Sequence, residues 1–165
     1  NRSSKWRGDV EYTYARKWTA SLKDFQINAV RVLKKSQNND FLDLCSLEVT
    51  SLAMRKYGDI FSAVVPVPCG NTPSHLCFST RLARAVAASM AVPCIEAFPH
   101  SGLTGASGRH KAKLVSAPSP NIETAGPVLL VDDVVTTGTH LERYAEALKA
   151  VGVVAFPIAW VGPYK

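Results

Sequence analysis

The chain has 165 residues, of which 47% are hydrophobic and 19% are charged, and it carries a formal net charge of +6. This length fits one domain of about 150 residues, and the hydrophobic fraction is sufficient for a core. The sequence contains no apolar run of about 18 residues and no apolar segment near its polar, basic N-terminus. It therefore predicts neither a transmembrane helix nor a secretory signal.

The four cysteines form no Cys-x-x-Cys pair; they are Cys45, Cys69, Cys77 and Cys94. His75 lies between Cys69 and Cys77, but this near-cluster is too sparse to predict a zinc site. We therefore expect ordinary thiols in a reducing compartment, and a cytoplasmic location.

The first 20 residues are basic and contain interleaved aromatic residues, namely Trp6, Tyr12, Tyr14 and Trp18. Residues 1–35 hold nine Lys or Arg and three acidic residues, whereas the rest of the chain holds ten of each. Such a segment can bind nucleic acid by stacking on bases and contacting phosphates. It can also be an arm that packs its aromatic rings on the domain and leaves its charges in water, which is the interpretation we favour.

Two helices are expected after this segment. The first opens at Ser21, where the sequence resembles a capping box, and it has Phe25 on its apolar face. The second runs from Asp40, as its N-cap, to Tyr57. We expect residues 1–58 to form a basic N-terminal arm with helices.

Residues 59–165 alternate between strand and helix patterns and form the predicted core. We expect strands at 60–67, 92–97, 128–131 and 153–160, a helix ending at 90, a helix from 141 to 152, and a long loop at 98–126. This alternation is typical of a parallel, doubly wound sheet flanked by helices. Functional residues are then expected at the carboxyl ends of the strands.

One of these carboxyl ends combines several features of a phosphate site. The predicted strand 128–131 is followed by Asp132 and Asp133, and then by a loop of small residues before a helix. The N-terminus of a helix offers free backbone N–H groups to an anion, and Gly138 allows close approach of the backbone. The carboxylates only accept hydrogen bonds when ionised, which suits sugar hydroxyls or hydrated Mg2+. Together these groups indicate a ribose 5-phosphate.

The stretch from Val128 to His140 resembles the 5-phosphoribosyl-1-pyrophosphate (PRPP) signature of type I phosphoribosyltransferases, and it is most similar to the ComF-like, competence-associated branch. The resemblance implies a single-domain α/β fold with a doubly wound, mostly parallel sheet and an N-terminal hood. It implies a glycosyltransferase that uses PRPP and Mg2+, transfers the 5-phosphoribosyl group to a nitrogenous base or other nitrogen nucleophile, and releases pyrophosphate. The sequence leaves the oligomeric state open, a homodimer included.

The resemblance also assigns roles to individual residues. Asp132 and Asp133 are the expected catalytic residues, with Mg2+ nearby. The expected 5-phosphate loop comprises Val134, Val135, Thr136, Thr137, Gly138, Thr139 and His140, and His140 stands where a small hydroxyl residue is more usual. The expected pyrophosphate loop comprises Pro68, Cys69, Gly70 and Asn71, and the expected mobile loop contains Arg109 and Lys111. ComF-like chains have an Arg-rich segment after the pyrophosphate turn, which residues 72–78 lack, so Arg81 and Arg84 are its candidate substitutes.

The acidic pair also fits two other interpretations. An apolar strand ending in Asp-Asp also describes a Walker B motif, but the chain has no Gly-x-x-x-x-Gly-Lys-Ser/Thr loop. The pair can also be turn chemistry. Three functional hypotheses remain: a phosphoribosyltransferase, a non-catalytic regulatory protein of the same fold that senses PRPP or a nucleotide, and nucleic-acid binding through residues 1–35.

Overall fold

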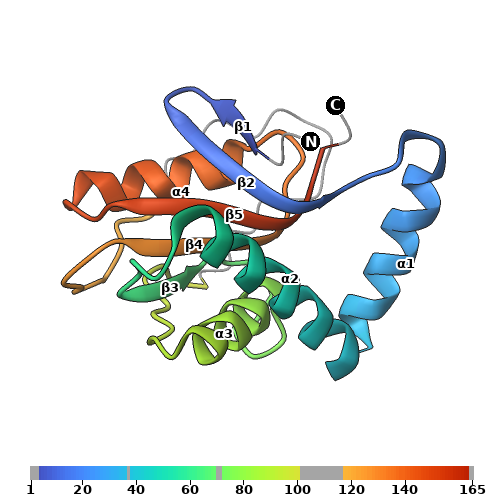
Figure 1. Ribbon diagram of the computed structural model, residues 1–165, viewed down its shortest axis with the longest axis horizontal. Coiled ribbons are helices and arrows are strands. Elements are labelled where there is room, and N and C mark those ends of the chain that lie inside the picture. Colours follow the sequence, from blue (N-terminus) through green and yellow to red (C-terminus); the bar gives the residue numbers. More distant parts are fainter. Residues whose placement is uncertain (1–3, 37, 70–71, 101–116, 164–165) are drawn as a thin grey trace.

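The computed structural model describes residues 4–36, 38–69, 72–100 and 117–163 (Figure 1). Five strands form one sheet in the order β1-β2-β5-β4-β3. Their bounds are β1 Ser4–Arg7, β2 Val10–Lys17, β3 Ala63–Pro66, β4 Val128–Val134 and β5 Ala155–Gly162. β1 is antiparallel to β2, and the other neighbouring strands are parallel. The predicted α/β class with a mostly parallel sheet is confirmed.

Helices cover both faces of the sheet. They are η1 Ala20–Leu22, α1 Lys23–Lys35, α2 Asn39–Tyr57, α3 Phe78–Met90 and α4 Thr139–Ala150. Figure 1 shows α4 on one face and α2 and α3 on the other, with α1 beyond the carboxyl ends of the strands. Alternate residues of β4 enter the two cores: Leu129 packs in the core that contains Leu82 of α3, and Leu130 packs in the core that contains Leu141 of α4. Within the described residues, no helix has the length and apolar character to span a membrane.

The N-terminal segment was expected to be an arm, but it contributes two strands to the sheet. β2 pairs with β5 from Thr13, opposite Ile158, to Lys17, opposite Gly162. The aromatic residues of this segment that are buried are Tyr12, Tyr14 and Trp18, whereas Trp6 is 68% exposed. The packing interpretation is therefore confirmed for three of the four rings. β-Branched and aromatic residues such as these favour strands, a signal that the basic charge of the segment obscured.

The prediction of a strand at 92–97 is wrong, because this segment forms a single isolated β-bridge and no regular strand. Cys94 pairs with Val64 of β3, where Val64 N–H donates to Pro93 O and Ile95 N–H donates to Val64 O, both at 2.9 Å. Pro93 has no N–H to extend the ladder. The segment therefore lies beside β3 as an edge without becoming a regular strand.

Two details of the N-terminal helices also differ from expectation. None of the described side chains of α1 is fully buried, and Phe25 is 76% exposed. The N-cap of α2 is Asn38, whose Oδ1 accepts a 2.8 Å hydrogen bond from Phe41 N–H, and not Asp40. Gly58 ends α2 as expected, with a φ of +75° that favours glycine.

Candidate functional site

The candidate site begins inside β4, because the strand continues three residues beyond its predicted end. Asp132 and Asp133 are both buried, and Asp132 lies opposite Ala159 of β5. The parallel neighbours β3 and β5 cover both edges of β4. The acidic pair is therefore held by the ladder and is not part of a flexible turn.

Asp132 and Asp133 point toward opposite faces of the sheet, as successive residues of a strand do. Asp132 faces α4, where its charge contributes to raising the pKa of Tyr144, after the larger effect of burial. Asp133 faces α1 and α2, where it forms an ion pair with Lys34 and contributes to raising the pKa of Cys45. The two carboxyl groups still interact with each other, because Asp133 contributes to raising the pKa of Asp132.

Burial dominates the ionisation of Asp132. Loss of solvent, followed by the neighbouring charge of Asp133, raises the pKa of Asp132 to about 8. The backbone N–H of Asp133 donates to Asp132 Oδ1 at 2.8 Å, which partly offsets the increase. The raised pKa favours the protonated form of Asp132, whose carboxyl group both donates and accepts hydrogen bonds.

Asp133 is held by a cation from outside the predicted core. Lys34 Nζ contacts Asp133 Oδ2, and the same ammonium lies 5.7 Å from the centre of the Phe78 ring at the start of α3. Asp133 Oδ2 is buried and accepts no hydrogen bond of regular geometry from the described residues. This oxygen therefore retains lone pairs that a ligand hydroxyl or a hydrated cation can use.

The loop after β4 delivers the chain to the N-terminus of α4. Gly138 is the N-cap of α4, has a φ of +81° and makes no side-chain cap. A Cβ atom at Gly138 would lie 2.6 Å from Tyr12 Cε1, so the buried Tyr12 ring requires glycine here. Thr137 Oγ1 lies 3.0 Å from Thr139 Oγ1 and 3.5 Å from Thr139 N, a distance too long for a strong cap.

The residues of the loop differ in their exposure to solvent. Thr136, Thr137 and His140 are exposed, Val135 is buried, and Val134 and Thr139 are intermediate. The first backbone N–H groups of a helix have no intrahelical acceptor. The loop therefore offers amides and hydroxyls to solvent beside a buried acidic pair.

A disulfide joins the expected pyrophosphate loop, at Cys69, to the N-cap of α3, at Cys77. Cys69 and Cys77 are bonded to each other, with a Cα–Cα distance of 5.6 Å, so the expectation of four ordinary thiols is wrong for this pair. Ser79 Oγ lies close to both sulfur atoms and donates to the carbonyl oxygen of Val67. Cys45 and Cys94 are free, as expected. A spacing of eight residues carries no sequence signature, which explains why the pairing was missed.

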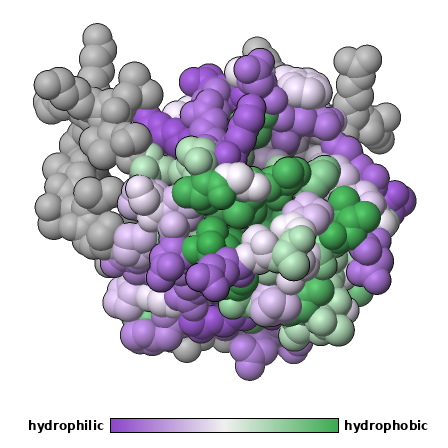
Figure 2. Space-filling view, turned by 90° about the vertical axis from the view of Figure 1, so that its left-hand side faces the viewer, coloured by the Kyte–Doolittle hydropathy of each residue, from purple (hydrophilic) through white to green (hydrophobic). Residues whose placement is uncertain are grey.

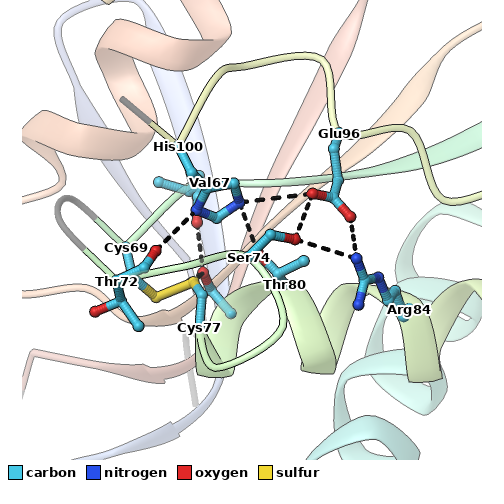
Figure 3. A network of polar contacts seen from close by, with 10 residues as sticks. Val67, Cys69, Thr72, Ser74, Cys77, Thr80, Arg84, Glu96 and His100 are labelled. Atoms are coloured by element: carbon cyan, nitrogen blue, oxygen red, sulfur yellow. Dashed lines mark hydrogen bonds and ion pairs between the residues drawn. A yellow bond between two sulfur atoms is a disulfide. The ribbon is translucent and has the colours of Figure 1, made fainter. Parts of the chain in front are cut away.

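Polar side chains tie this loop to the segment after α3 (Figure 3). The Nδ1–H of His100 donates to the Thr72 carbonyl at 3.2 Å, and Ser74 Oγ donates to Glu96 Oε2 at 2.5 Å. Arg84 forms an ion pair with Glu96 and donates to Ser74 Oγ at 3.1 Å. Arg84 is therefore engaged by Glu96 and Ser74 in this network.

Several predicted residues cannot be placed in this site. Gly70, Asn71, Arg109 and Lys111 lie outside the described residues. Arg81 lies on α3, where its Nη2 is 3.5 Å from Asn39 Oδ1. The structure brings together the acidic pair, the loop after β4 and the N-terminus of α4.

Two residues of the site were not predicted. Lys34 forms the ion pair with Asp133, and the Tyr12 ring packs close to Gly138. Lys34 stands in the last turn of α1, where a basic residue is ordinary, so no local pattern marks it. Tyr12 would have been found by identifying β2 as a strand beside β5, because that strand lies next to the loop.

Within the described part of the chain, no group of three His, Cys, Asp or Glu side chains is arranged to hold a metal ion. Mg2+ at phosphate sites takes most of its ligands from water and phosphate oxygens, so Asp132 and Asp133 would hold a hydrated ion only in their ionised forms. No protein-family model matches the chain, and no curated protein sequence matches it.

Proposed function

We propose that this protein binds PRPP with Mg2+ at the carboxyl ends of the strands and transfers the 5-phosphoribosyl group to a nitrogen nucleophile, with release of pyrophosphate. The observation that supports this most is the continuous arrangement of β4, the loop at Gly138 and α4, in which a buried acidic pair is followed by an uncapped helix N-terminus. Amides and hydroxyls suit a phosphate, and carboxylates suit ribose hydroxyls.

The reaction breaks the bond between C1 of the ribose and a pyrophosphate oxygen, and forms a bond between C1 and the acceptor nitrogen, with inversion. The acceptor nitrogen loses a proton in the process. By analogy with glycoside chemistry, the transition state resembles an oxocarbenium ion. Catalysis then depends on positioning and electrostatics, which can supply several kcal/mol.

The residues of this chain act by holding the ribose phosphate. Thr136, Thr137 and Thr139 with the first amides of α4 hold the 5-phosphate. Asp132 donates a hydrogen bond to, or accepts one from, a ribose hydroxyl, and Asp133 accepts one through Oδ2 beside Lys34. Mg2+, when bound, supplies positive charge that offsets the charge that develops on pyrophosphate.

An activity assay tests the proposal. The double variant Asp132→Asn, Asp133→Asn keeps the size of both side chains, so we expect it to fold and to lose pyrophosphate release over a panel of nitrogenous bases. Asp59→Asn is the matched control, because Asp59 is exposed and lies before β3. Undiminished pyrophosphate release in the double variant would end the assignment.

A second candidate is a regulatory protein that binds PRPP or a nucleotide without turnover. Three observations favour it: Lys34 already neutralises Asp133, a disulfide ties Cys69 of the loop expected to bind pyrophosphate to Cys77, and Arg84 is engaged by Glu96. Calorimetry with PRPP and Mg2+, run beside the pyrophosphate assay, separates the two candidates. Saturable binding without pyrophosphate release supports the sensor, and binding with release supports the enzyme.

A further inference from the structure

A groove of about 520 Å³ opens at the amino ends of the strands, away from the acidic pair. Its lining comes from four places: Trp6 in the N-terminal hairpin, Tyr57 at the end of α2, Lys149 in the last turn of α4, and the start of β5 at Phe156. Figure 2 faces this end of the molecule and shows apolar side chains gathered in the middle of the face, with mostly hydrophilic residues around them.

The groove exists because β2 and β5 separate at their amino ends. Their pairing begins at Thr13, opposite Ile158, whereas residues 155–157 of β5 pair with β4. Pro157 has no N–H to donate to a neighbouring strand. Residues 10–13 of β2 pair with β1 instead. The opening is therefore a wedge between two strands of the sheet, built from regular secondary structure.

The walls of the wedge are mainly apolar, and its rim is aromatic and acidic. Trp6, on the hairpin wall, is 68% exposed and offers much of its indole to a ligand. Three carboxylates and one ammonium group belong to the lining: Asp9, Glu11, Glu146 and Lys149. Lys56 neutralises Glu11 at 3.0 Å, which leaves two carboxylates against one ammonium. The net charge of the groove lining is therefore negative, whereas the whole chain has a net charge of +6.

We propose that this groove is a second binding site, for a small organic cation with a flat apolar body, such as an arylalkylammonium ion. The volume lies within the range of about 300–1,000 Å³ that small-molecule sites occupy. The acidic rim attracts a cation, and the face of Trp6 adds a cation–π or stacking contact. The site lies at the other end of the strands from the PRPP site and does not depend on it.

The test uses 2-phenylethylammonium as the probe and the full chain as the protein. We expect saturable shifts of the Trp6 indole N–H and of backbone amides of residues 153–157 in ¹H–¹⁵N NMR spectra, with millimolar affinity. Trp6→Ala weakens binding about three- to fivefold, as expected for an exposed cation–π contact. The anion 3-phenylpropionate has the same ring and a similar length, and we expect it to bind at least about threefold more weakly.

The controls separate this site from non-specific adsorption. Phe25→Ala removes another exposed aromatic ring, 76% accessible and on α1, and leaves the affinity unchanged. Asp9→Asn with Glu146→Gln reduces the preference for the cation while retaining the apolar contact. Absence of saturation at about 20 mM probe, equal binding of the anion, or an equal loss in Phe25→Ala would each overturn the proposal.

Discussion

Lys34 of α1 forms an ion pair with Asp133 of β4. The pair connects the N-terminal helical region to the acidic pair of the candidate site. Asp133 retains 11% of its side-chain exposure and Lys34 retains 28%, so the pair is largely shielded from water. Removal of one partner therefore leaves the other poorly compensated.

The variant Lys34→Met tests this relationship, because it keeps the length of the side chain and removes its charge. We expect the free energy of unfolding to fall by about 1–3 kcal/mol, the cost of leaving a charged group without its partner. Adding Asp133→Asn restores part of the loss. Urea unfolding measures the change, and Lys35→Met, at the exposed neighbouring position, is the control. Equal stability of Lys34→Met and Lys35→Met would contradict the pairing.

Asp132 predicts a pH dependence of stability. Its pKa is raised to about 8 in the folded protein, whereas an unfolded aspartate has a pKa of about 4. Between these values the folded state binds more protons than the unfolded state, so stability falls as pH rises, by up to about 1.4 kcal/mol per pH unit. We expect the stability of Asp132→Asn to lack this pH-dependent contribution.

The measurement is denaturant unfolding of both proteins at several pH values between about 4 and 9. The difference in unfolding free energy between Asp132→Asn and the parent grows in favour of the variant as pH rises, and it becomes constant above about pH 8. A difference that does not change with pH would show that the carboxyl group of Asp132 titrates normally.

Gly138 and Gly152 form a matched pair for a test of the loop before α4. Both have a φ of +81°, but a Cβ at Gly138 would lie 2.6 Å from the Tyr12 ring, whereas a Cβ at Gly152 would have no atom within 4 Å. Alanine costs about 1–2 kcal/mol at either position through the backbone. We expect Gly138→Ala to lose more stability than Gly152→Ala in thermal unfolding. Adding Tyr12→Leu to Gly138→Ala should remove this additional loss, because it removes the ring that the new Cβ would meet. Equal losses would rule out the close contact.

The disulfide predicts a redox-dependent stability. Cys69 and Cys77 are separated by eight residues, and closure of so short a loop stabilises a fold by about 2–3 kcal/mol in the chain-entropy account. We expect dithiothreitol, or Cys69→Ser with Cys77→Ser, to lower the unfolding free energy by this amount. Cys94→Ser is the control, because Cys94 is free. An identical loss in Cys94→Ser, or no loss on reduction, would contradict the assignment.

Local patterns were sufficient for the parts of the fold that repeat a simple periodicity. The continuous apolar run before Asp132 predicted β4, which is buried on both faces, and Leu82 with Val86, four residues apart, predicted the buried face of α3. The loop from β4 to α4 was also predicted from a local pattern. Its glycine and hydroxyls are consecutive in the sequence.

Relationships between distant residues were not predictable in this way. Three such relationships are the pairing of β2 with β5, the bond between Cys69 and Cys77, and the contact of Lys34 with Asp133. Each depends on the tertiary structure that brings the two partners together. The end of β4 was placed too early because carboxylates are rare inside strands. Burial of Asp132 between two neighbouring strands overrides that preference.

Calorimetry tests the central claim most directly, by measuring the binding of PRPP with Mg2+ to the parent protein and to Thr137→Val. Thr137 is exposed in the loop before α4, and its hydroxyl is expected to donate to the 5-phosphate. The account predicts saturable binding to the parent and about tenfold weaker binding to the variant, the effect of losing one hydrogen bond to a charged group, with Thr19→Val binding as the parent does. No binding to the parent, or equal affinity of Thr137→Val, would contradict it.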